Sequence, residues 1–135
     1  MPQAQHLGRL ACADIFLDTW PCNAHTTASD ALWMGVPLVT IKGQTFANRV
    51  AASLLHAVGL DELACDDVQS YQETVLALAA DAPRRQRFVL HLQTQRGAGG
   101  LFDGAAFARD FEALLMRAWQ RACTGLPPTP LEAQA

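Results

Sequence analysis

Hydrophobic residues along the chain follow two different spacings, and each spacing predicts a different kind of element. Apolar runs at residues 15–17 and 38–41 show no regular polar alternation, which is typical of strands that are buried on both faces. Apolar residues recur every three or four positions over residues 26–34 and 47–58, which predicts two helices. The order strand, helix, strand, helix predicts a Rossmann-like βαβ unit with a parallel sheet and a right-handed crossover.

Glycine and proline mark the ends of both predicted helices. Gly35 and Pro37 follow the first helix and Gly59 follows the second. Glycine readily adopts the left-handed backbone found after a helix C-terminus, and proline cannot continue a helix. At the start of the first helix, Thr27 and Asp30 have the spacing of a capping box.

The rest of the chain is predicted to be helical. Helices are expected at residues 3–12, from Asp67 or Ser70 to Ala80, at residues 83–95 and from Asp103 onward, with a flexible joint at residues 97–100. The inner face of the last helix is expected to carry Phe107, Phe111, Leu114, Leu115, Ala118 and Ala122. Residues 1–125 would form one partial α/β domain that ends in helices, and residues 126–135 a disordered tail.

Only two strands are predicted, whereas a typical sheet has about five. The edges of such a small parallel sheet would leave backbone groups unpaired. We therefore expect the chain to be part of a larger domain whose other strands cover these edges.

Composition narrows the class of protein. Half of the residues are hydrophobic, 17% are charged and the net charge is -3, which favours a globular chain without a surface for nucleic acid or an anionic membrane. No apolar run reaches the about 18 residues of a membrane span, so a cytoplasmic location is expected. Four cysteines lack the spacing of a zinc site, and no metal site is expected: Cys12, Cys22, Cys65 and Cys123.

The stretch DTWPCNAHTTASD, residues 18–30, carries the chemistry. It runs from the end of the first strand into the following helix, the edge of an α/β sheet where ligands bind. Free backbone N–H groups at the helix start favour a phosphate, with donors from His25, Thr26 and Thr27, while Asp30 could accept from ribose hydroxyls. Residue types alone also allow simpler roles: Thr27 and Asp30 as helix caps, His25 held by a backbone carbonyl, and Asp18 as a turn former.

One long stretch resembles the C-terminal part of the catalytic region in the protein O-GlcNAc transferase family, and the chain looks like a bacterial-type homologue. The stretch is ADIFLDTWPCNAHTTASDALWMGVPLVTIKGQTFANRVAASLL, continued by GLDEL. The resemblance implies the C-terminal half of a two-domain B-type glycosyltransferase that moves N-acetylglucosamine from UDP-GlcNAc to serine or threonine of proteins. The alternative is a non-catalytic nucleotide-sugar-binding or interaction module.

The resemblance also implies roles for individual residues. His25, Thr26 and Thr27 would bind the diphosphate, with His25 as the catalytic residue that stabilises the leaving group. Asp30 would hold the ribose, and His6 and Arg9 would contact the uracil, although His6 could also be an ordinary exposed helical histidine. Gln44 departs from the family, which usually has an acidic residue there.

The family further implies no metal or other cofactor, and partners beyond this sequence. These are the upstream half of the catalytic region, which carries the lysine that neutralises the diphosphate, and upstream repeats that bind the acceptor protein. We therefore expect the isolated chain to be inactive. The last helix would contact the upstream half, which leaves Met116, Trp119 and Leu126 partly exposed in this chain.

Overall fold

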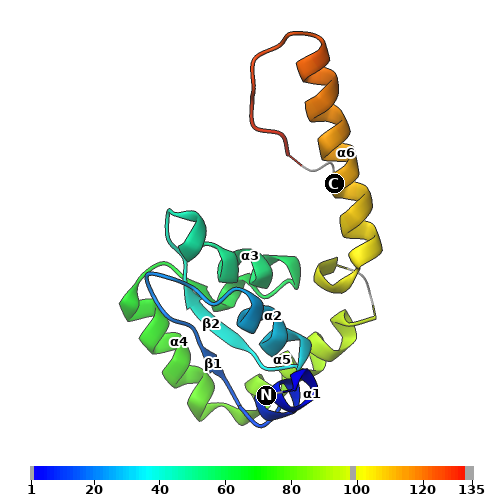
Figure 1. Ribbon diagram of the computed structural model, residues 1–135. Coiled ribbons are helices and arrows are strands. Elements are labelled where there is room, and N and C mark those ends of the chain that lie inside the picture. Colours follow the sequence, from blue (N-terminus) through cyan, green and yellow to red (C-terminus); the bar gives the residue numbers. More distant parts are fainter. Residues whose placement is uncertain (1, 98–99, 133–135) are drawn as a thin grey trace.

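A parallel sheet of three short strands lies among the first five helices, as the computed structural model shows (Figure 1). The structure describes residues 2–97 and 100–132. The helices are α1 (Gln3–Leu10), α2 (Thr26–Trp33), α3 (Val50–Ala57), α4 (Val68–Ala80), α5 (Ala82–Gln95) and α6 (Gly104–Cys123). The strands are β1 (Phe16–Leu17), β2 (Leu38–Ile41) and β3 (Ala64–Cys65). Short 3-10 turns lie at Phe46–Asn48, Asp61–Leu63 and Gly100–Phe102.

The strands follow the order β1-β2-β3, and both pairings are parallel. Phe16 lies opposite Leu38, and Thr40 lies opposite Ala64. The predicted parallel βαβ unit is therefore confirmed. Leu38, Val39 and Thr40 are fully buried, as expected for a central strand covered on both faces.

Two details of the predicted sheet were wrong. The third strand, β3, was missed because two residues are too short to show a hydrophobic period, and the strand exists only through its pairing with β2. Leu17 was expected to be buried but is 54% exposed. The reason is that β1 lies at the edge of the sheet formed by the described residues.

Helices cover the sheet on both faces. α2 and α3 pack on one face, and α4 lies on the other (Figure 1). The core between them contains fully buried leucines from each layer, Leu32, Leu55 and Leu78. This arrangement places the N-terminus of α2 at the carboxyl edge of the sheet, where the sequence predicted a ligand.

Most helix boundaries follow the predicted signals. Gly35 and Gly59 have φ angles of 83° and 70° after α2 and α3. Asp67 and Asp103 accept hydrogen bonds from backbone N–H groups at the starts of α4 and α6 and cap both helices, which fits the predicted starts at these residues. α3 is shorter than predicted because the Asn48 side chain accepts from the Thr45 N–H at 2.7 Å and holds a 3-10 turn before it.

α6 extends away from the sheet (Figure 1), and the prediction of a buried inner face is wrong for the described residues. Phe107 and Phe111 are 68% and 51% exposed, because the rest of the described chain offers no layer against which this helix could pack. The expected exposure of Met116, Trp119 and Leu126 is confirmed.

Residues 124–132 run back beside α6 without helix or strand, and the Pro127 and Glu132 carbonyls accept from Arg121 and Arg117. Residues 98–99 of the predicted flexible joint and 133–135 of the predicted disordered tail lie outside the described residues. Over the part of the chain that the structure describes, no helix combines the length and the apolar character needed to cross a membrane.

Candidate functional site

The loop between β1 and α2 is closed at its base by one buried carboxylate. Asp18 is 9% exposed, and its Oδ1 accepts from the N–H groups of Thr19 (2.8 Å) and Ala24 (2.7 Å). Its Oδ2 accepts from the Thr40 hydroxyl at 2.6 Å. Asp18 therefore holds a turn, which was the simpler of the roles open to it.

A second contact fixes the loop to the segment that follows β2. The Asn23 N–H donates to the Ala47 carbonyl at 2.9 Å, and the Asn23 side chain donates to the Thr19 carbonyl at 3.1 Å. These bonds bring residues 19–24 beside residues 46–47. His25, two residues after Asn23, is thereby placed next to Phe46, and the two rings lie edge to face with their centroids 5.9 Å apart.

The N-terminus of α2 is left without a side-chain cap by the described residues. His25 is the N-cap residue, and its carbonyl accepts from the Ser29 N–H at 3.1 Å. The predicted capping box of Thr27 and Asp30 is therefore wrong: the helix begins two residues earlier than such a box requires. The first backbone N–H groups, and the exposed side chains of Thr26 and Thr27, remain available to an anion.

The His25 side chain is exposed and only weakly held. Its Nε2 lies 3.5 Å from the Ala47 carbonyl oxygen, at the outer limit of a hydrogen bond. This contact agrees with the expected alternative of a histidine held by a backbone carbonyl, but it is too long to fix the ring firmly in one orientation. A small rotation would leave the ring free to donate to a ligand.

His6, Arg9 and Asp30 come together although 24 residues separate the first and the last. α1 packs beside α2, and His6 Nε2 lies 3.2 Å from Asp30 Oδ2, with both side chains 26% exposed. Arg9 lies 3.4 Å from His6 Nδ1. The contacts fit a tautomer in which His6 Nε2–H donates to the carboxylate and Nδ1 accepts from Arg9. This cluster lies one helical turn from Thr26 and Thr27, so the structure brings the six predicted residues to α1 and to residues 25–30 at the start of α2.

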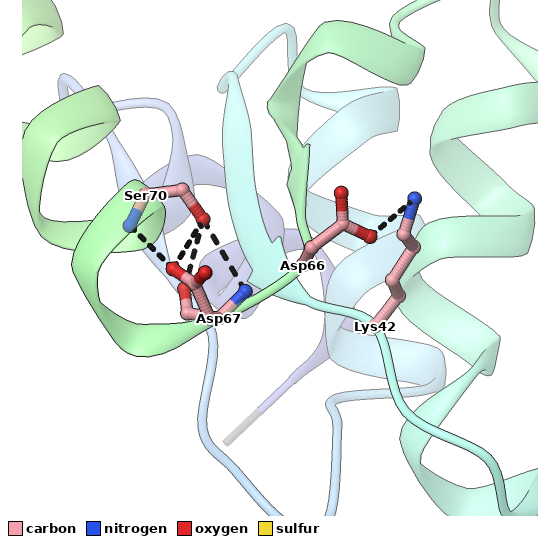
Figure 2. Close-up of polar contacts among 4 residues, drawn as sticks. All are labelled: Lys42, Asp66, Asp67 and Ser70. Atoms are coloured by element: carbon pink, nitrogen blue, oxygen red, sulfur yellow. Dashed lines mark hydrogen bonds and ion pairs between the residues drawn. The ribbon is translucent and has the colours of Figure 1, made fainter.

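A pair of charged residues lies at the carboxyl ends of β2 and β3 (Figure 2). Lys42 Nζ and Asp66 Oδ1 are 2.8 Å apart and point toward each other, and the hydrogen bond and charge of Asp66 raise the pKa of the lysine. At the adjoining start of α4, the backbone N–H and hydroxyl of Ser70 lower the pKa of Asp67. Lys42, Gln44, Phe46, Arg49 and Asp66 line an open groove, and Phe46 also contacts the ring of His25.

Sequence reasoning missed the contacts of Lys42 with Asp66, of Asp18 with Thr40, and of the Tyr71 hydroxyl, which donates to the Asp18 carbonyl at 3.1 Å. The two residues of each contact lie between 22 and 53 positions apart in the sequence, so no local spacing signals the contact. The contact of Lys42 with Asp66 also depends on the unpredicted strand β3. Within the described ranges, no group of three or more His, Cys, Asp or Glu residues is placed to hold a metal ion.

A parallel sheet with an uncapped helix start at its carboxyl edge is the arrangement of α/β nucleotide-binding domains. The chain belongs to glycosyl transferase family 41, whose family model matches residues 1–111. The expected membership of the O-GlcNAc transferase family is thus confirmed.

Similar proteins in two plants and an animal carry related names. The chain is 35% identical over 127 residues to a probable UDP-N-acetylglucosamine–peptide N-acetylglucosaminyltransferase, SEC, of Arabidopsis thaliana. It is 37% identical over 123 residues to the transferase of that name in Caenorhabditis elegans, and 36% identical over 124 residues to a probable one, SPINDLY, of Solanum lycopersicum. These matches cover 93%, 91% and 92% of the chain but 13%, 11% and 13% of the relatives.

A solved structure shares the fold. A mutant O-GlcNAc transferase of Thermobaculum terrenum matches with a TM-score of 0.88 and 34% identity over 93% of this chain and 24% of that one. The match confirms the expected α/β class of the B-type glycosyltransferases. The relatives are named as transferases, which gives no support to the alternative of a non-catalytic module.

Proposed function

We propose that this chain binds the donor nucleotide in a glycosyltransferase that moves N-acetylglucosamine from UDP-GlcNAc to serine or threonine of a protein. The observation that carries the proposal is the uncapped start of α2, where His25, Thr26 and Thr27 are exposed together. Backbone N–H groups and the positive end of the helix dipole favour the diphosphate there, and the two hydroxyls and the imidazole add donors.

The nucleoside would bind on the α1 side of the same helix. Asp30 is one turn beyond the phosphate donors, the separation expected between a diphosphate and the ribose attached to it. His6 Nε2 holds the Asp30 carboxylate at 3.2 Å, which orients its oxygens for the ribose hydroxyls. The half-buried ring of His6 and the guanidinium of Arg9 would contact the uracil.

In the proposed reaction, an acceptor hydroxyl attacks the anomeric carbon of the sugar. A new bond forms between that carbon and the acceptor oxygen, and the bond from the carbon to the β-phosphate oxygen breaks. Negative charge then develops on the departing UDP, and donors already aimed at it lower the barrier. His25 would donate to this charge as the catalytic residue, while the hydroxyl proton passes to a base that we do not assign to this chain.

Nucleotide selectivity tests the binding part of this proposal. Calorimetric titration of the chain should show weak binding of UDP and weaker or no binding of NAD. His25→Ala should reduce UDP affinity. His56→Ala is the control: it removes a histidine at the C-terminal end of α3 that is bonded to Asp61, and it should leave UDP affinity unchanged. Equal or tighter binding of NAD, or equal effects of the two variants, would overturn the assignment.

Transfer is tested separately with labelled UDP-GlcNAc and an acceptor rich in serine and threonine. Transfer requires the acceptor to be held in line with the anomeric carbon, and such positioning supplies several kcal/mol of catalysis, about 7–11 at most. The 135-residue chain should not transfer the sugar, because we expect the other half of the catalytic region to hold the acceptor. Steady transfer above a His25→Ala control would show that this chain holds the acceptor unaided.

A further inference from the structure

Asp18 occupies a position from which one side chain can set the geometry of the phosphate site. Thr19 and Ala24 begin and end the loop, and their N–H groups donate to the same carboxylate oxygen at 2.8 and 2.7 Å. The two ends of the loop are therefore held together by one atom. Ala24 directly precedes His25, so this bond also determines where α2 begins.

The carboxylate is itself held by the core of the domain. Its second oxygen accepts from the hydroxyl of Thr40, a fully buried residue of the central strand, at 2.6 Å. The Tyr71 hydroxyl, from α4 on the other face of the sheet, donates to the Asp18 backbone carbonyl at 3.1 Å. Burial raises the pKa of Tyr71, so its hydroxyl stays protonated and keeps donating at neutral pH. β1, β2 and α4 thus all fix the position of Asp18.

The cost of burying the Asp18 carboxylate indicates a specific role for its negative charge. A carboxylate this deeply buried is costly unless each oxygen is hydrogen-bonded, and here both are. Hydrogen bonds to an ionised acceptor are roughly twice as strong as neutral ones. A neutral side chain of the same shape would hold the loop less firmly.

The nucleoside side of the site does not depend on this carboxylate. His6 and Asp30 are positioned by the packing of α1 on α2, and their contact involves no residue of the loop. Loosening the loop should therefore displace the phosphate donors at residues 25–27 and leave the nucleoside contacts in place.

We propose that Asp18 is a positioning residue that holds the start of α2 in the geometry that binds a diphosphate. It acts through the Ala24 N–H and does not contact the ligand. The inference rests on the proposed function and deepens it, because it names the group that aligns the phosphate donors.

Three ligands and matched variants test this role. NMR titrations, which measure millimolar constants, would compare UDP, inorganic diphosphate and uridine. Asp18→Asn keeps the shape but removes the charge, and it should weaken UDP and diphosphate at least about fivefold while changing uridine less than about twofold. Thr40→Val removes one donor and should act in the same direction, whereas Thr40→Ser keeps the hydroxyl and should retain wild-type affinities.

The outcomes separate the two hypotheses. Equal losses for all three ligands, or no loss, in an Asp18→Asn variant with a wild-type circular dichroism spectrum would overturn the positioning role. If that variant does not fold, the difference between Thr40→Val and Thr40→Ser decides by the same criterion. Absence of UDP and diphosphate binding by the wild-type chain would instead overturn the proposed function.

Discussion

Asp30→Ala should separate recognition of the nucleoside from recognition of the phosphates. The substitution removes a 26% exposed carboxylate that lies 3.2 Å from His6 Nε2. Asp30 does not cap α2, because His25 is the N-cap residue and the helix continues to Trp33. Loss of UDP binding in this variant would therefore not follow from loss of a helix cap.

The size of the effect can be worked from these contacts. A hydrogen bond to a charged group contributes about 1.5–3 kcal/mol. Because a quarter of the side chain is exposed to water, we take the lower end, about 1.5 kcal/mol, which is roughly tenfold in the dissociation constant of UDP. Loss of the partly exposed pair with His6 should lower the free energy of unfolding by less than about 1 kcal/mol.

Calorimetry with two ligands measures the difference. UDP should bind about tenfold more weakly to the variant, and inorganic diphosphate should bind as it does to the wild type. Asp61→Ala is the matched control, since it removes a carboxylate 2.7 Å from a histidine outside the site and changes the net charge equally. Equal weakening of UDP and diphosphate by Asp30→Ala, or an equal effect of the control, would refute the ribose assignment.

Three further predictions concern stability and association. Leu55→Ala empties a fully buried position and should lower the free energy of unfolding in urea by about 2–5 kcal/mol; a loss below about 1 would contradict its place in the core. Ser70 lowers the pKa of Asp67 from 3.8, so this bond stabilises the fold above that pH and its contribution is lost as the pH falls through the lowered value. Asp67→Ala should therefore destabilise the fold more at about pH 6 than at about pH 2 in urea unfolding, and an equal effect at both pH values would refute this reasoning. Trp119 is 66% exposed on the apolar face of α6, so Trp119→Ser should reduce self-association in sedimentation velocity, and unchanged association would exclude this face as its cause.

Local signals in the sequence determined the elements and the region of the site. The apolar spacing of residues 26–34, the glycines at 35 and 59 and the cap at Asp103 each act within a few residues, so the pattern predicted α2, α3 and α6. The His-Thr-Thr run could be assigned to a helix start for the same reason. Family membership also followed from the order of residues along the chain.

Only the tertiary structure decided how distant residues meet. β3 exists because Ala64 and Cys65 pair with β2, and the Lys42–Asp66 contact depends on that pairing. Asp18 meets Thr40, and His6 meets Asp30, across 22 and 24 residues. Hydrophobic period and capping describe a residue and its near neighbours, whereas these contacts depend on sheet register and on the packing of α1 against α2. The sequence could therefore name candidate residues for the site, and the fold was needed to show which of them hold one another in place.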